Sequence, residues 1–230
     1  MRDRFSSVRL QMIDAILFDN DGVLVDTESA FFEVTRESFA RMGVVLTPLL
    51  WARTYLGKGQ TSRDIAKDLG IPPGRIGAMV DERNRIWKER MESGVSLRPK
   101  VRETLRALRG GVRMAVVTGS PRDQFDEVHR FTDLRDYFET VLTSEDYERS
   151  KPHPDAYVAA LHELDLPADR CIAVEDSPRG VSSALSAGLR CILVPTELTE
   201  LSMCRGATFV VEDISGVIPI VLAENGRLKK

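Results

Sequence analysis

Short apolar runs alternate with amphipathic segments over most of this chain, and the alternation predicts its fold. The first run, Ile13 to Phe18, is followed by acidic residues and is typical of a buried strand. Similar runs at 112–117, 141–142, 171–174, 190–194 and 208–211 predict further strands, with helices between them at 101–108, after Pro121, at 154–164 and at 178–187. Strands that alternate with helices favour an α/β fold with a Rossmann-like, doubly wound parallel sheet.

One connection, residues 28–97, is far longer than an ordinary crossover. Its apolar residues recur at helical spacing, as in Phe32, Thr35 and Phe39 and again in Ile76 and Val80. We therefore predict an α/β core domain at 12–27 and 98–230, with an inserted α-helical cap domain at 28–97. Ligands of open parallel sheets bind beyond the carboxyl ends of the strands. The insertion leaves from that end of the first strand, so we expect the cap to cover the site.

Polar residues suited to phosphate chemistry follow four successive strands. They are Asp19 and Asp21 after the first strand, Thr118, Gly119 and Ser120 after the second, Lys151 after the third, and Glu175 and Asp176 after the fourth. Each group taken alone is more typical of a turn or a helix cap. Turn requirements by themselves do not explain four complementary groups at one edge of a sheet, so we interpret them as a functional site.

The chemistry of these groups points to hydrolysis of a phosphate ester. Residues two apart on an extended chain face the same side, so Asp19 and Asp21 can share one pocket. We predict that Asp19 attacks phosphorus and that Asp21 transfers the proton. Mg²⁺ between Asp19 and the Asp176 and Glu175 pair would offset the repulsion between anions.

The transferring phosphate oxygens also need donors that are already in place. The hydroxyls of Thr118 and Ser120, the backbone amides around Gly119 and the ammonium of Lys151 are the candidates. The predicted activity is therefore Mg²⁺-dependent hydrolysis of a small-molecule phosphate monoester, a sugar phosphate or small organic acid phosphate, through an aspartyl-phosphate.

The four motifs together resemble those of the haloacid dehalogenase-like hydrolase superfamily. The motifs lie at Asp19–Thr27, Val117–Ser120, Ser150–Asp155 and Glu175–Gly180. The chain is most similar to the branch of the superfamily that has a helical cap, which includes β-phosphoglucomutase and phosphoglycolate phosphatase-like enzymes. The resemblance implies that Asp19 is nucleophile and metal ligand, that Asp21 is acid and base and binds metal through its backbone carbonyl, and that Asp176 is a ligand. Glu175 is a further candidate ligand. The resemblance also implies a short flap between Gly22 and Thr27.

The resemblance leaves two alternatives open. Asp21 argues against a dehalogenase or a phosphonoacetaldehyde hydrolase, because these relatives lack an acid at this position. A phosphomutase shares all four motifs, but β-phosphoglucomutases carry a histidine where residues 28–33 have none. A non-catalytic protein that binds phosphorylated metabolites is the second alternative, although such a binder does not need both Asp19 and Asp21.

The cap should select the substrate. Three residues are candidate substrate contacts: Lys58 and Arg63, in a loop similar to the substrate loop of capped relatives, and Glu28. The simpler interpretation of Lys58 and Arg63 is that they are solvated cations of a loop. The simpler interpretation of Glu28 is an acid that interacts with the dipole at a helix N-terminus. We predict that Trp51 and Trp87 lie in the cap core. The histidines, His129, His153 and His162, are predicted to be surface residues.

The amino-acid composition indicates which kind of molecule this protein binds. Lys and Arg number 32 against 35 Asp and Glu, so no basic excess indicates nucleic acid, and a small-molecule phosphate ester fits better. No apolar run is long enough to cross a membrane. Three cysteines without metal-ligand spacing favour reduced thiols and a cytoplasmic location. We interpret residues 1–11 as either a dispensable extension or an artefact of the choice of start codon. We expect the protein to be a monomer, with a weak dimer as the alternative.

Overall fold

A computed structural model describes residues 12–226 and contains a six-stranded parallel sheet in the order β3-β2-β1-β4-β5-β6. The strands are β1 (Ala15–Phe18), β2 (Arg113–Val117), β3 (Thr140–Leu142), β4 (Cys171–Glu175), β5 (Arg190–Leu193) and β6 (Phe209–Val210). The predicted α/β fold with a doubly wound parallel sheet is confirmed. The expected extension at 1–11 lies outside the described residues.

Strand β1 lies in the middle of the sheet and is buried along its whole length. It pairs with β2 on one side and β4 on the other, with Phe18 opposite both Val116 and Val174. The carboxyl ends of these strands are therefore level with one another. Consequently, the residues that follow β1, β2 and β4 meet at one edge of the sheet.

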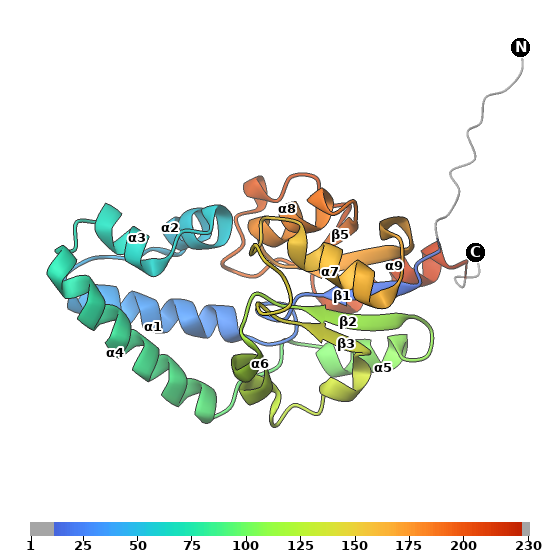
Figure 1. The fold of residues 1–230 in the computed structure, drawn as a ribbon, viewed down its shortest axis with the longest axis horizontal. Coiled ribbons are helices and arrows are strands. Elements are labelled where there is room, and N and C mark those ends of the chain that lie inside the picture. Colours follow the sequence, from blue (N-terminus) through green and yellow to red (C-terminus); the bar gives the residue numbers. More distant parts are fainter. Residues whose placement is uncertain (1–11, 227–230) are drawn as a thin grey trace, which may run out of the picture.

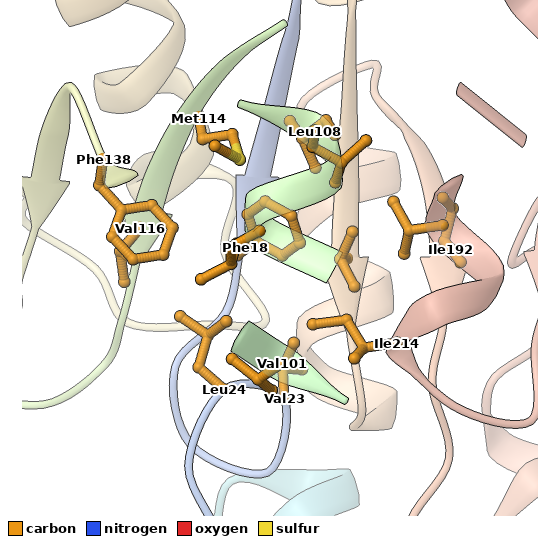
Figure 2. Close-up of a cluster of buried hydrophobic side chains, with 14 of the residues drawn as sticks. Phe18, Val23, Leu24, Val101, Leu108, Met114, Val116, Phe138, Ile192 and Ile214 are labelled. Carbon is orange, nitrogen blue, oxygen red and sulfur yellow. The ribbon is translucent and has the colours of Figure 1, made fainter. Parts of the chain in front are cut away.

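Helices cover both faces of the sheet (Figure 1). They are α5 (Val101–Leu108), α6 (Arg122–His129), α7 (Asp155–Leu164), α8 (Pro178–Ser186) and α9 (Val217–Glu224). Ile16 and Phe18 point to the face covered by α5, α6 and α9, whereas Ala15 and Leu17 point to α7 and α8. Figure 2 shows Phe18 within the first cluster, among side chains from β2 and α5. The alternation along β1 explains why a short, fully apolar run forms this strand.

Between β1 and α5 the chain forms a helical layer beyond the edge of the sheet, on the left in Figure 1. It consists of α1 (Thr27–Arg41), α2 (Pro48–Trp51), a π-helical turn (Ala52–Leu56), α3 (Ser62–Asp68) and α4 (Pro73–Glu92). These helices share a hydrophobic cluster built around Phe39, Trp51 and Ile65. We refer to this layer as the cap; its boundaries at 28 and 97 stay a prediction.

The segment between β1 and the cap is a tight turn. The backbone carbonyl of Asn20 accepts hydrogen bonds from the amides of Val23, Leu24 and Val25. Val25 then bridges to Leu97, so the chain leaving the core lies beside the chain returning to it. Within residues 12–226, no helix is both long and apolar enough to cross a membrane.

Candidate active site

Three buried carboxylates meet at the carboxyl edge of the sheet. Asp19 follows β1, while Glu175 ends β4 and Asp176 follows it; one oxygen from each lies within 4.8 Å of the others. Burial, then the charge of Glu175, raises the pKa of Asp19 to about 8. Burial, then Asp19, raises the pKa of Asp176 well above its usual value. So much negative charge out of water is unfavourable without a counter-ion.

This acidic cluster could hold a divalent cation. Asp176 Oδ2 and Glu175 Oε2 are buried and make no hydrogen bond to any part of the chain that the structure describes. Buried carboxylate oxygens normally have a partner, and hard oxygen ligands suit Mg²⁺. The donor set therefore fits a divalent cation of this kind.

Lys151 brings a positive charge into direct contact with the cluster. Its ammonium lies 3.1 Å from Asp19 Oδ1 and 2.7 Å from Glu175 Oε1, and donates to the carbonyl of Val117 at 2.9 Å. Burial lowers the pKa of Lys151, but the charges of Asp19 and Glu175 raise it by a larger amount, so the net shift of the pKa is upward. The hydroxyl of Tyr157 donates to the same Glu175 oxygen at 2.6 Å. Glu175 is thus held in place as the anchor of Lys151.

Two glycines let the backbone approach these carboxylates. Gly22 has φ +83°, and a Cβ there would lie 2.1 Å from Asp176 Oδ2. A Cβ on Gly180, in the first turn of α8, would lie 1.9 Å from Glu175 Oε2. Any side chain at either position would push the carboxylate out of its place.

Asp21 is surrounded by hydroxyl groups. Thr118 and Ser120 each donate to its Oδ2 at 3.0 Å, and Thr27 donates to its Oδ1 at 2.5 Å. These three contacts fix the orientation of the Asp21 carboxyl group. Asp21 and Asp19 line the same cavity, and the intervening Asn20 points away from it.

Only some of the residues predicted to donate hydrogen bonds to the phosphate line the cavity. Ser120, Gly119 and Lys151 line the cavity, whereas Thr118 is fully buried and does not. The hydroxyls of Thr118 and Ser120 each have one proton, and both give it to Asp21 in this structure. To donate to a phosphate, Ser120 would have to turn away from Asp21.

A cavity of about 390 Å³ lies between the cap and the acidic cluster. The predicted cap contact Glu28 lines it, and its Oε1 accepts a hydrogen bond from Trp51 Nε1 at 2.9 Å. Trp51 is fully buried, as predicted. Lys58 and Arg63 are exposed and do not line the cavity. Helix α3 buries Ser62 and Ile65 and leaves Arg63 on its exposed side, 4.0 Å from Asp81.

Several cavity residues were not expected from the sequence. Arg179, Tyr55 and Asn84 line the cavity, and so does Trp87, which was predicted to lie in the cap core. Trp87 is only half-buried, because α4 continues past the cap core towards α6. Arg179 lies within the motif after β4, but its place in a capping sequence gave no indication of which way it points.

Of the three histidines predicted to lie at the surface, His129 is buried, so the prediction is wrong for this residue. His153 and His162 are exposed as predicted, but His129 is 8% exposed. Its Nε2 lies 2.7 Å from Asn20 Oδ1 and its Nδ1 lies 2.8 Å from Thr132 Oγ1. Helix α6 places the ring under the turn that carries Asp19 and Asp21, a long-range contact that no local pattern reveals.

Comparison with known proteins places this geometry in a family. The model of the haloacid dehalogenase-like hydrolase family matches residues 16–194. The protein CbbY of Cereibacter sphaeroides is 33% identical over 210 residues, covering 85% of this chain and 90% of that protein. A phosphorylated carbohydrates phosphatase of Thermotoga maritima is 29% identical over 185 residues, covering 77% of this chain and 82% of that protein.

A solved structure agrees with these matches. The crystal structure of a CbbY mutant from Rhodobacter sphaeroides, in complex with xylulose-(1,5)bisphosphate, has a TM-score of 0.71 and 29% identity, and covers 89% of this chain and 96% of that one. The family match spans β1 to the end of β5 and includes every residue of the acidic cluster. This chain therefore belongs to the haloacid dehalogenase-like hydrolase family.

Proposed function

We propose that this protein is a Mg²⁺-dependent phosphatase that hydrolyses a phosphorylated sugar or a similar small polyhydroxy phosphate. The observation that carries the proposal is the convergence of Asp19, Asp176 and Lys151 beneath a cavity that also contains Asp21. The names of two relatives agree with it, since one is a phosphorylated carbohydrates phosphatase and the other was solved with a sugar bisphosphate.

In the first step, a carboxylate oxygen of Asp19 attacks phosphorus and the bond to the ester oxygen breaks. Asp21, which lines the same cavity, enters this step protonated and gives its proton to the leaving alkoxide. Lys151 and the amides around Gly119 and Ser120 hold the transferring oxygens. The product of this step is an aspartyl-phosphate on Asp19 and a free alcohol.

In the second step, water attacks the phosphorus of the aspartyl-phosphate. Asp21, now ionised, takes the proton from this water, and Asp19 and inorganic phosphate are released. The three hydroxyls bonded to Asp21 hold its carboxyl group in position for both proton transfers.

Asp19 and Asp176 would hold Mg²⁺, with the backbone carbonyl of Asp21 as a further ligand. The bound ion would offset the charge of the carboxylates and the phosphate. Glu175 would act through Lys151, because one of its oxygens is already bonded to that ammonium and to Tyr157.

The experiment is a phosphate-release assay with Mg²⁺ on p-nitrophenyl phosphate and a panel of sugar and short-acid phosphates. We expect release from at least one member, and we expect Asp19→Asn to reduce turnover at least about 1,000-fold because the nucleophile is lost. The folded state of that variant is checked by circular dichroism.

The other candidate functions give different results in the same assay. A phosphomutase would interconvert glucose phosphate isomers in the presence of a bisphosphate and release little phosphate. A binding protein would retain the panel compounds without turnover. Undiminished activity of Asp19→Asn would refute the assigned nucleophile.

A further inference from the structure

Arg179 has a place in the cavity that the chemistry at Asp19 does not use. It is the second residue of α8 and follows the acidic cluster by three positions. Its guanidinium carbon lies 5.1 Å from the centre of the Tyr55 ring, so a core residue is stacked on a cap residue. Both residues line the cavity, and the attraction between the guanidinium and the ring stabilises Arg179 at this place.

The guanidinium of Arg179 has no hydrogen-bond acceptor or ion-pair partner among the described residues. Other arginines of this chain show the contrast: Arg113 binds both oxygens of Glu139, and Arg149 binds both oxygens of Asp155. A partly buried guanidinium with five open donors is poorly solvated and favours an anion.

Glu28 provides the complementary group on the cap side. Glu28 is 7% exposed, and Trp51 donates a hydrogen bond to only one of its carboxylate oxygens. Burial, the largest effect, raises the pKa of Glu28, while the charge of Arg179 opposes this shift. Glu28 and Arg179 line one cavity without forming an ion pair within 4.0 Å. An acceptor and a cationic donor therefore stand apart, with room for a ligand to contact both.

The position of the reacting phosphate defines which part of the substrate reaches these groups. Lys151, Asp19 and Ser120 mark the phosphate end of the cavity, and Glu28, Tyr55 and Asn84 mark its cap end. A volume of about 390 Å³ accommodates a short polyhydroxy chain or a single sugar ring. The leaving group must therefore lie against Arg179 and Glu28.

We propose that Arg179 binds a second anionic group on the substrate, a carboxylate or a second phosphate, while Glu28 accepts a hydrogen bond from one of its hydroxyls. This inference rests on the proposed phosphatase function and narrows its substrate class to phosphate esters with a second acidic group. The planar guanidinium can bind either anion through two parallel hydrogen bonds, and its contact with the Tyr55 ring stabilises its position in the cavity.

The test compares matched pairs of phosphate esters that differ in the second acidic group. Glycerol 3-phosphate against 3-phosphoglycerate tests a carboxylate, and fructose 6-phosphate against fructose 1,6-bisphosphate tests a second phosphate. The measured quantity is the ratio of kcat/KM within each pair. We expect the original chain to prefer the diacid of at least one pair by about 10- to 100-fold, the size of a charge-assisted hydrogen bond.

Arg179→Gln should reduce that ratio about tenfold or more, and Arg179→Lys should reduce it less because the charge is kept. Arg75→Gln, on an exposed position of α4, is the matched control and should keep the ratio of the original chain. A ratio that Arg179→Gln leaves unchanged, or a preference for the partner without the second acid in both pairs, would overturn the proposal.

A binding measurement tests the role of Arg179 separately from phosphatase activity. The same four compounds are titrated calorimetrically into Asp19→Asn and into the double variant Asp19→Asn with Arg179→Gln. Tighter binding of a diacid that the double variant loses supports the role of Arg179 even where no phosphate is released. Equal binding of all four compounds to Asp19→Asn contradicts it, even where the original chain is an active phosphatase.

Discussion

At the scale of single residues, the acidic cluster depends on the absence of a side chain at Gly180. A Cβ at this position would lie 1.9 Å from Glu175 Oε2, and the opposite oxygen is held by Lys151 and Tyr157. We expect Gly180→Ala to lower the free energy of unfolding by about 1–3 kcal/mol, because the buried carboxylate has no space to move into. It should also reduce phosphate release, because Lys151 would shift with Glu175.

The control for this variant is Gly77→Ala in α4. A Cβ on Gly77 would meet no atom within 4 Å beyond its own helix turn. Alanine is the better helix former, so we expect this variant to gain about 0.5–1 kcal/mol. Urea denaturation measures both changes. Equal stability of the two variants would show that the close contact at Gly180 relaxes at no cost.

A second residue-scale prediction concerns pH and His129. Burial, its largest effect, lowers the pKa of His129 to about 4. The unfolded chain has the ordinary pKa of about 6.5. Between these values the unfolded state binds a proton that the folded state does not bind, so stability is lost as the pH falls from about 6.5 to about 4, by about 3 kcal/mol at most.

The variant His129→Gln removes this titration along with the hydrogen bond to Asn20. At pH 8 we expect it to be less stable than the original chain by about 1–2 kcal/mol, because Asn20 Oδ1 loses its partner. This difference should shrink as the pH is lowered to 4. His153→Gln, at an exposed position, is the control and should show no such trend. A difference that is constant with pH would mean that His129 is not held neutral.

At the scale of elements, the segment after β5 connects the cap to the acidic cluster. Leu198 is 3% exposed and packs into the cap hydrophobic cluster, although it belongs to the sequence of the core. The hydroxyl of the next residue, Thr199, donates to the backbone carbonyl of Asp176 at 2.7 Å. Glu200 lies 3.4 Å from Arg53 of the cap. The cap therefore contacts the core beyond its two covalent connections.

We expect Leu198→Ala to destabilise the protein by about 2–4 kcal/mol, because it leaves a cavity in the cap cluster. Leu201→Ala is the matched control, since Leu201 lies in the same segment and is 56% exposed. We expect the control to change stability by no more than about 0.5 kcal/mol. Urea denaturation measures both free energies of unfolding. An equally large loss of stability in Leu201→Ala would show that the effect of Leu198→Ala does not come from a cavity in the cap cluster.

At the scale of the whole molecule, much of the buried negative charge is concentrated at one edge of the sheet. Asp19, Glu175 and Asp176 are all less than one-tenth exposed, and Lys151 is the cation in contact with the cluster. Folding this chain without a metal therefore places repelling carboxylates together. Binding of a divalent cation should release this unfavourable energy and couple metal binding to folding.

We accordingly expect Mg²⁺ to raise the melting temperature. At about 100 times its Kd the ion stabilises the folded state by about 2.7 kcal/mol, or about 5–10 °C for a chain of this size. Asp176→Asn should lose most of this response and, without metal, should melt at a higher temperature than the original chain. Asp136→Asn, at an exposed position, serves as the control. The same rise in both variants would indicate that Mg²⁺ binds outside the cluster.

Much of the fold could be predicted because burial leaves a local pattern. The strands formed within two residues of their expected positions, since a strand covered on both faces must be apolar along its length. Helix α9 lies beyond the last element expected from the sequence, because Pro219 and its uniformly apolar residues give no clear helical stripe. The order of polar groups after the strands likewise indicated which residues meet at the edge of the sheet.

The sequence by itself determined the parallel sheet and the group of residues at its carboxyl edge, because strands that alternate with helices run parallel and bring the residues after each strand to one edge. The tertiary structure decided what surrounds them. It placed Arg179 on Tyr55, His129 under Asn20 and Trp87 in the cavity, and it turned Lys58 and Arg63 away. These contacts depend on how the cap and α6 pack against the core, over separations in sequence that no periodicity encodes.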